Sequence, residues 1–302
     1  MNSTRTGAAQ NSLHRWWTIL LDAGRLWLDR NAFSYAGSLA FYTLFSLAPV
    51  VIIAVTIIGV VLGEQAAQGQ IVAQLQDLMG HEAAAAVEKA VARSRLSETG
   101  LLPTVLGAAA MAVGATTVFA QMQQALNAIW GVAARPGRSS LFAWVKRRVL
   151  SLTVVLSIGV VMLASLLFGV ALRAVLRFTD RFLPATAALL SGAEVLVSWA
   201  ATTMLFAAIF KVLPDVVLRW RDVLLGAAVT ATLFAVGRYA IAVYLTHTAT
   251  ASTYGAAGAV VLILMWVYYS SLILLFGTAF TSAQLQASGQ LPAPRAGAVR
   301  VA

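Results

Sequence analysis

Six long stretches of uncharged, mainly apolar residues recur along this 302-residue chain. No charged residue occurs between Arg30 and Glu64, and the last stretch lies within an uncharged run from Tyr239 to Pro294. Each stretch is near or above the ~20 residues that a helix needs to cross the ~30 Å hydrocarbon core of a bilayer. Because 60% of all residues are hydrophobic and only 11% are charged, too little charge remains to cover a water-soluble surface. Lipid is therefore the predicted solvent.

The predicted fold is all-α: a polytopic membrane protein with six transmembrane helices and short amphipathic interfacial helices. A transmembrane domain over residues 34–287 holds the six spans, at about 36–62, 101–122, 149–172, 189–210, 223–245 and 256–285. The first span would be about 40 Å long at 1.5 Å per residue. It is longer than the ~30 Å core, so it must tilt or bend, and Pro49 provides a place to bend.

Basic residues are distributed unequally between the two sides of this arrangement. With a cytoplasmic N-terminus, 14 of the 21 Lys and Arg residues fall in cytoplasmic segments and 7 fall outside or in the outer part of a span. An excess of Lys and Arg in short loops marks the cytoplasmic side. Both termini are therefore predicted to be cytoplasmic.

The segments that flank the spans have different characters. The N-terminal segment, residues 1–33, holds an amphipathic stretch over His14–Arg30, which either lies on the cytoplasmic surface or begins a long first helix. The loop over residues 64–100 is predicted to be periplasmic, with two short amphipathic helices. The tail over 288–302, which contains Pro292 and Pro294, is predicted to be disordered and cytoplasmic.

The usual signatures of enzymes and metal sites are missing. His14, His81 and His247 lie in separate segments, and there is no cysteine, so no metal site is expected. No Gly-rich loop followed by Lys and Ser/Thr occurs, which excludes an ATPase motor within this chain. We expect no cofactor and no enzymatic activity.

Polar residues inside the spans are the candidate site, because a polar group in hydrocarbon needs a partner. In the first span Tyr35, Ser38 and Tyr42 share one helical face. They either line a polar path or bond to backbone carbonyls and anchor neighbouring helices. In the second span an amide stripe either lines a hydrated vestibule or lies in water beyond the membrane; its members are Gln121, Gln124 and Asn127.

Two ionisable residues fall within the later spans, Glu194 in the fourth and Arg238 in the fifth. Both are placed in the outer half of the bilayer, where a mutual ion pair would remove the cost of two lone charges. The pair is either structural or leaves Arg238 to contact an anionic substrate or headgroup. Alternatively, Arg238 extends alone to the outer headgroups.

Three segments resemble the YihY/BrkB family of bacterial inner-membrane proteins. They are AGSLAFYTLFSLAPV (Ala36–Val50), FKVLPDVVLRWRDVLLGA (Phe210–Ala227) and YGAAGAVVLILMWVYYSSLILLFGTAF (Tyr254–Phe280). The resemblance covers about residues 15–287, and Arg238 falls where that family tends to carry a basic residue. It implies six helices in the bacterial inner membrane.

The family labels say little about activity. The label ribonuclease BN implies tRNA processing, which needs metal ligands or an acid–base set beside a basic groove. The longest cytoplasmic loop offers only the basic residues between Arg135 and Arg148. The label virulence or serum-resistance factor names a phenotype of the envelope.

We therefore carry three hypotheses for this chain. The first is a protein that transports or accommodates an amphiphilic envelope compound without its own ATPase. The second is a non-transporting scaffold for envelope proteins, and the third is a membrane-bound ribonuclease. The expected partners are membrane lipids, together with envelope proteins or further copies of the chain, and no nucleic acid is expected.

Overall fold

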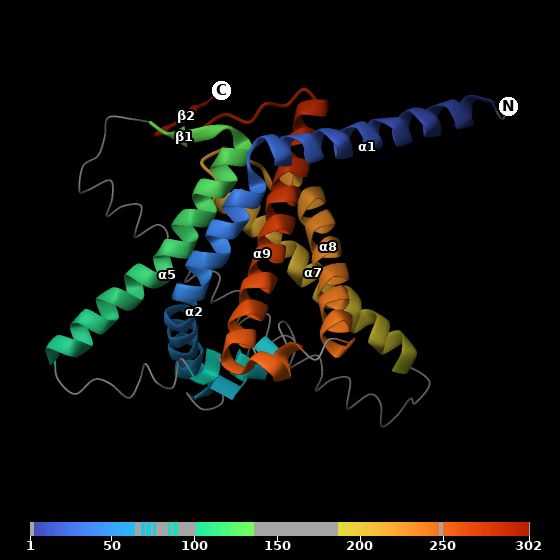
Figure 1. Cartoon of the computed structure of the whole chain (residues 1–302). Helices are drawn as coiled ribbons and strands as arrows, with labels where there is room; N and C mark the ends of the chain where they lie inside the picture. Colours follow the sequence, from blue (N-terminus) through green and yellow to red (C-terminus); the bar gives the residue numbers. More distant parts are fainter. Residues whose placement is uncertain are drawn as a thin grey trace.

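The computed structural model describes residues 3–63, 101–135, 187–247 and 250–301, together with 68–69, 71–73, 75–76, 84–85 and 87–89 of the first loop. The elements are α1 (Ser3–Asp29), α2 (Ala32–Leu62), α5 (Leu101–Trp130), β1 (Val132–Ala134), α7 (Ala187–Val212), α8 (Trp220–His247), α9 (Thr250–Ala287) and β2 (Ala298–Arg300). Figure 1 shows α9 running between α2 and α5 on one side and α7 and α8 on the other. The predicted third span and most of the predicted periplasmic loop lie outside the described residues.

Within the residues that the structure describes, three helices are long and apolar enough to cross a membrane. The segments are Val195–Val212 of α7, Trp220–Ile241 of α8 and Val260–Ala287 of α9, which correspond to the fourth, fifth and sixth predicted spans. Helices α2 and α5, with 31 and 30 residues, overlap the first two. The helical class and the membrane character are confirmed, while the number of six spans stays a prediction.

Helices α1 and α2 are separate and meet at a sharp bend (Figure 1). Asn31, between them, has a φ of 54°, in the left-handed region that Asn tolerates better than most residues. A helix cannot continue through such a residue, so the alternative of one long first helix is excluded. Beyond the bend, α2 packs against both α5 and α9.

A row of aromatic rings connects α7, α8 and α9 in the core. Phe206 lies 6.3 Å from Phe210 and 5.7 Å from Phe234, and Phe234 lies 5.5 Å from Trp266, measured between ring centroids. These separations fall within the range of favourable aromatic pairs. Trp266 of α9 is thus part of the packed core.

Helices α8 and α9 approach closely where a glycine of each faces a threonine of the other. A Cβ atom on Gly226 would overlap Thr281 Oγ1, and one on Gly277 would overlap Thr230 Oγ1. Both hydroxyls are satisfied within their own helices: Thr230 donates to Gly226 O at 2.7 Å and Thr281 to Gly277 O at 2.8 Å. The two Gly-x-x-x-Thr patterns therefore permit a close crossing without an unpaired polar group.

The tail after Ala287 is ordered through two sets of backbone contacts. Strand β2 pairs antiparallel with β1, from Val132 opposite Arg300 to Ala134 opposite Ala298, and a second bridge joins Val216 to Pro294. This order contradicts the disorder predicted for 288–302. The composition of the tail is that of a loop, but β1 and the α7–α8 connection supply the hydrogen-bond partners that it lacks alone.

Replacing Gly277 by Ala tests the close crossing. The added methyl group must displace Thr230, so we expect a loss of about 1–3 kcal/mol in stability, the usual cost of overpacking. The loss is measured by thermal unfolding of the detergent-solubilised protein, with size-exclusion chromatography used to monitor the fraction that remains folded.

The matched control is Gly37→Ala on α2, where an added Cβ atom meets nothing within 4 Å. This change should be neutral or should stabilise by up to about 1 kcal/mol. The double variant G277A/T230A should recover part of the loss. Equal effects of G277A and G37A would contradict the close crossing.

Candidate functional site

A polar cluster joins the end of α5 to the connection between α7 and α8. Asn127 Nδ2 donates to Asp215 Oδ2 at 2.8 Å, and the backbone N–H of Asp215 donates to Asn127 Oδ1 at 2.7 Å. Gln123 Nε2 donates to the other carboxylate oxygen at 3.2 Å. Because Asn127 is only 8% exposed and uses both ends of its amide, this pairing has one orientation.

Arg295 of the tail joins the same cluster. Its guanidinium donates to the carbonyl oxygens of Lys211 at 2.7 Å and Val212 at 3.0 Å, and its backbone N–H donates to Asp215 O at 2.8 Å. The last carbonyls of a helix have no intrahelical partner and carry partial negative charge. Arg295 therefore caps α7. We call Gln123, Asn127, Asp215 and Arg295 the polar clamp.

The chemistry of the polar clamp is that of a structural link. Both carboxylate oxygens of Asp215 accept hydrogen bonds from α5, and the guanidinium of Arg295 is occupied by carbonyl oxygens. Within the described ranges, no three His, Asp or Glu residues gather where they could hold a metal ion. The clamp fixes three distant parts of the chain to one another.

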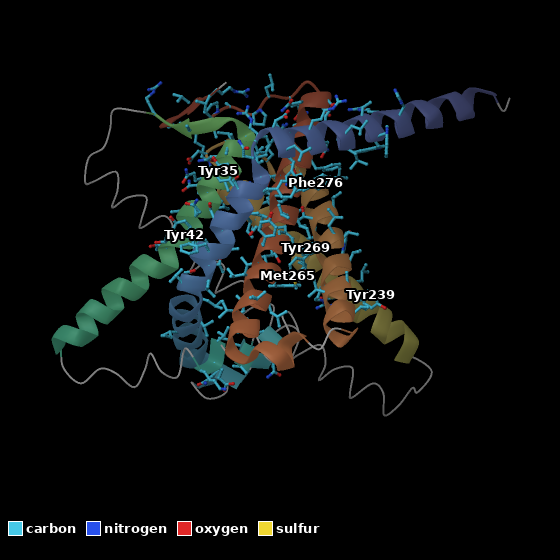
Figure 2. All side chains as sticks on the ribbon, viewed as in Figure 1. Tyr35, Tyr42, Tyr239, Met265, Tyr269 and Phe276 are labelled. Carbon is cyan, nitrogen blue, oxygen red and sulfur yellow. The ribbon has the colours of Figure 1, made fainter. Side chains whose placement is uncertain are left out.

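The three residues of the predicted polar face of the first span differ in burial and in contacts, and Figure 2 labels two of them, Tyr35 and Tyr42. Tyr35 is half-buried against the main core, and Ser38 Oγ donates to Ser34 O at 3.1 Å. Tyr42 stays 38% exposed, with its ring edge-on to Phe41 at 5.8 Å. Ser38 thus follows the alternative of backbone bonding, and Tyr42 remains available at the surface.

The predicted amide stripe of the second span also divides. Gln124 is exposed and Gln121 is partly exposed, whereas Asn127 is buried in the polar clamp. Sequence reasoning missed Gln123, Asp215 and Arg295. The signal for Asp215 was its place directly after the Leu213-Pro214 pair that follows the fourth span, since a carboxylate at that position needs donors from another segment.

Arg238 lies exposed on α8 and makes no hydrogen bond or ion pair with any other described residue. It is 18 residues from the start of α8, or about 27 Å along the axis, which approaches the full thickness of a ~30 Å core. The adjacent Tyr239 is 74% exposed and points away from the bundle (Figure 2). The structure does not describe the side chain of Glu194. The ion pair between Glu194 and Arg238 therefore stays a prediction.

Gly237 provides room for an aromatic ring beside Arg238. A Cβ atom at this position would overlap the ring of Tyr269 from α9, whose hydroxyl donates to Leu233 O at 3.4 Å. Tyr269 therefore lies against the backbone of α8. This contact holds the segment that carries Arg238 against the central helix.

The sequence of this chain is similar to those of bacterial membrane proteins. The family described as Virulence factor BrkB matches residues 24–299. A UPF0761 membrane protein of Xanthomonas axonopodis pv. citri is 29% identical over 287 residues, which cover 90% of this chain and 64% of the relative. A UPF0761 membrane protein of Chromobacterium violaceum is 28% identical over 253 residues, 82% of this chain and 57% of the relative.

A shorter match, 37% identical over 75 residues, involves a UPF0761 membrane protein of Tolumonas auensis and covers 24% of this chain and 25% of that relative. The chain thus spans less than two thirds of the length of these curated relatives. No solved structure matches this chain.

Replacing Asn127 by Asp tests the polar clamp. The variant loses the donor to Asp215 and places two carboxylates in contact, so we expect a loss of about 1.5–3 kcal/mol at neutral pH. The exchanged pair N127D/D215N restores one donor and one acceptor and should recover most of this loss. Thermal unfolding in detergent measures both effects.

The control for this series is Gln124→Asp, one helical turn from Asn127 and exposed. This change should shift stability by no more than about 0.5 kcal/mol. If the exchanged pair is no more stable than N127D alone, the proposed pairing of Asn127 with Asp215 is wrong.

Replacing Arg295 by Ala removes the cap from α7. We expect faster hydrogen exchange over residues 213–217 and 293–301, because this cap and the tail strand hold each other in place, and a stability loss of about 1–2 kcal/mol. Exchange is followed by mass spectrometry. Arg221→Ala is the matched control, since Arg221 is exposed and has no partner among the described residues; equal exchange in the two variants would argue against the cap.

Proposed function

This chain belongs to the virulence factor BrkB family of membrane proteins, and we propose that it binds and moves an amphiphilic, lipid-like envelope compound in the bacterial inner membrane. It does so without an ATPase of its own and without covalent chemistry. Movement follows a gradient or depends on a partner protein.

The observation that carries this proposal is the difference between the two ends of the helices. At one end the polar clamp ties α5, the α7–α8 connection and the tail together. At the other end every residue from 195 to 201 of α7 is exposed, which is about two helical turns. Helices α5 and α7 also diverge from α9 toward this end (Figure 1).

An apolar helix that is exposed all round needs lipid as its solvent. Within 195–201, Trp199 donates to Thr232 of α8 at 3.1 Å, yet Val195 and Leu196 are 70% and 65% exposed. Acyl chains solvate such a surface well. Helices α5 and α7 are joined through the polar clamp at one end and diverge at the other (Figure 1). In this proposal an acyl chain enters laterally between the helices at the diverging end.

A polar headgroup needs hydrogen-bond partners on the same protein. Tyr42, Gln124 and Arg238 are exposed and have no hydrogen-bond partner within the part of the chain that the structure describes. They therefore retain the capacity to bind a polar or anionic group. In this proposal they are the residues that contact the headgroup.

The proposed orientation has both termini in the cytoplasm. In support of it, α1 and the C-terminal strand lie at the same end of the molecule (Figure 1). Exposed basic residues occur at this end, among them Arg25 and Arg219, whose side chains are 76% and 75% exposed. Such residues favour the cytoplasmic side.

A scaffold without transport is the second candidate function. The exposed apolar faces of α7 and α8, with Val236 at 61% and Tyr239 at 74% exposure, also suit contact with another membrane protein. Helix faces pack against one another in lipid through such contacts. Transport activity distinguishes the two candidates.

Reconstitution into liposomes tests the proposed function. We expect the purified protein to accelerate movement of a fluorescent anionic phospholipid between leaflets, measured by chemical quenching of the outer leaflet, without release of an entrapped soluble dye. Arg238→Ala should lower the initial rate by about fivefold or more, the effect of one lost charge-assisted contact. Arg221→Ala should change the rate by less than about twofold.

Absence of protein-dependent movement for every lipid and small solute tested, with a monodisperse protein, would shift the conclusion to the scaffold. Equal rates for wild type and Arg238→Ala would remove Arg238 from the proposed path. Release of the entrapped dye would indicate leakage instead of transport.

A further inference from the structure

The surface of α1 is divided lengthwise into three sectors. One sector faces α9: Ile19 and Ala23 are buried against Phe280 and Ala283. Farther along, Trp27 Nε1 donates to the carbonyl oxygen of Leu272 at 3.2 Å. These contacts fix the rotation of α1 about its own axis.

A second sector is apolar but uncovered. Trp17, Leu21 and Leu28 are 61%, 44% and 57% exposed, and an added Cβ atom on Gly24 between them would meet nothing within 4 Å. These four positions follow the spacing i, i+4, i+7 and i+11, which forms a straight line along a helix. We call Trp17, Leu21, Gly24 and Leu28 the uncovered stripe.

The third sector is polar. On a helical projection with about 100° per residue, the polar sector lies between the uncovered stripe and the sector that faces α9. Arg25 and Asp22 lie here 4.0 Å apart, with 76% and 62% of their side chains exposed; the other exposed members are His14, Arg15, Thr18 and Asp29. This sector faces water.

The direction of α1 decides what lies against the uncovered stripe. Figure 1 shows α1 crossing α9 at a large angle in the C-terminal half of α9. The contacts run from Leu272 to Ser288, and so reach the end of the apolar window at Ala287. Because α9 is long and apolar enough to cross the membrane along its axis, a helix that crosses it here lies along the membrane surface. With one sector against the protein and one in water, the remaining sector faces the lipid.

The charge at this end of the molecule selects the kind of lipid. Exposed cations include Arg15, Arg25, Arg221 and Arg300. The acidic groups are partly engaged: the carboxylate of Asp222 lies 3.4 Å from Nε of Arg219. A surface with excess positive charge attracts anionic headgroups. Trp17 suits the boundary between headgroups and acyl chains.

We propose that the uncovered stripe of α1 inserts into the leaflet on its own side of the membrane and binds anionic phospholipid there. The stripe is a lipid-binding surface separate from the proposed transport path, so it holds whether or not the chain moves a substrate. The bound leaflet holds α1 in the surface plane and thereby positions the bend at Asn31 through which α2 enters the membrane.

The cysteine-free chain allows a direct test with single spin labels. Labels are attached at Leu21→Cys and Leu28→Cys on the stripe, and at the matched controls Thr18→Cys and Asp29→Cys on the polar sector. The full chain is placed in nanodiscs of phosphatidylcholine with or without phosphatidylglycerol. Power saturation compares collisions with oxygen, which concentrates in lipid, and with a water-soluble nickel complex.

We expect the ratio of oxygen to nickel collisions to be at least about threefold higher at Leu21→Cys and Leu28→Cys than at the two controls, as for a helix half-immersed in the interface. Phosphatidylglycerol should raise this ratio further at the stripe positions and leave the controls unchanged. Both results together support the proposal.

Three outcomes would overturn it. Equal nickel access at all four positions would place the stripe in water. Dipolar broadening between labels on two chains would show that a second copy covers the stripe. A ratio at the stripe that does not respond to phosphatidylglycerol would remove the preference for anionic lipid.

Discussion

The reciprocal hydrogen bonds between Asn127 and Asp215 are the contact on which the arrangement of the helices depends. They join α5 to the α7–α8 connection, and Arg295 adds the tail to the same point. A partly buried carboxylate is costly unless its oxygens are paired, so Asp215 depends on the amide donors of α5. Polar pairing specifies this contact more sharply than apolar packing does, because only one orientation satisfies every donor.

A second constraint comes from the lipid itself. Between helices in a bilayer there is little hydrophobic driving force, so close packing and satisfied polar groups hold them together. The α8–α9 crossing meets both needs, since Gly226 and Gly277 allow close approach while Thr230 and Thr281 bond within their own helices. The chain combines this firm crossing and the polar clamp with helix segments that are left to the lipid, such as residues 195–201.

The helices and the family could both be predicted from the sequence, because both depend on patterns within short segments of the chain. An uncharged run of bilayer length has few alternatives to a helix, and the helical spacing within His14–Arg30 predicted the amphipathic α1. The same reasoning grouped Gln121, Gln124 and Asn127 as one stripe, whereas the structure buries Asn127 alone. Spacing shows which residues share a helix face but not which neighbour covers that face, so Asp215, 88 residues away, was not found.

The residues alone are sufficient to establish that this chain is helical and resides in a membrane, since composition and the length of apolar runs are properties of short segments. The fate of individual polar groups depends on contacts between segments far apart in the chain. The tail is an example: its prolines and small residues indicate a loop, and it becomes a strand because β1 and the end of α7 present unpaired backbone groups beside it. Hydrogen-bond partners that exist only after folding cannot be read from the segment that needs them.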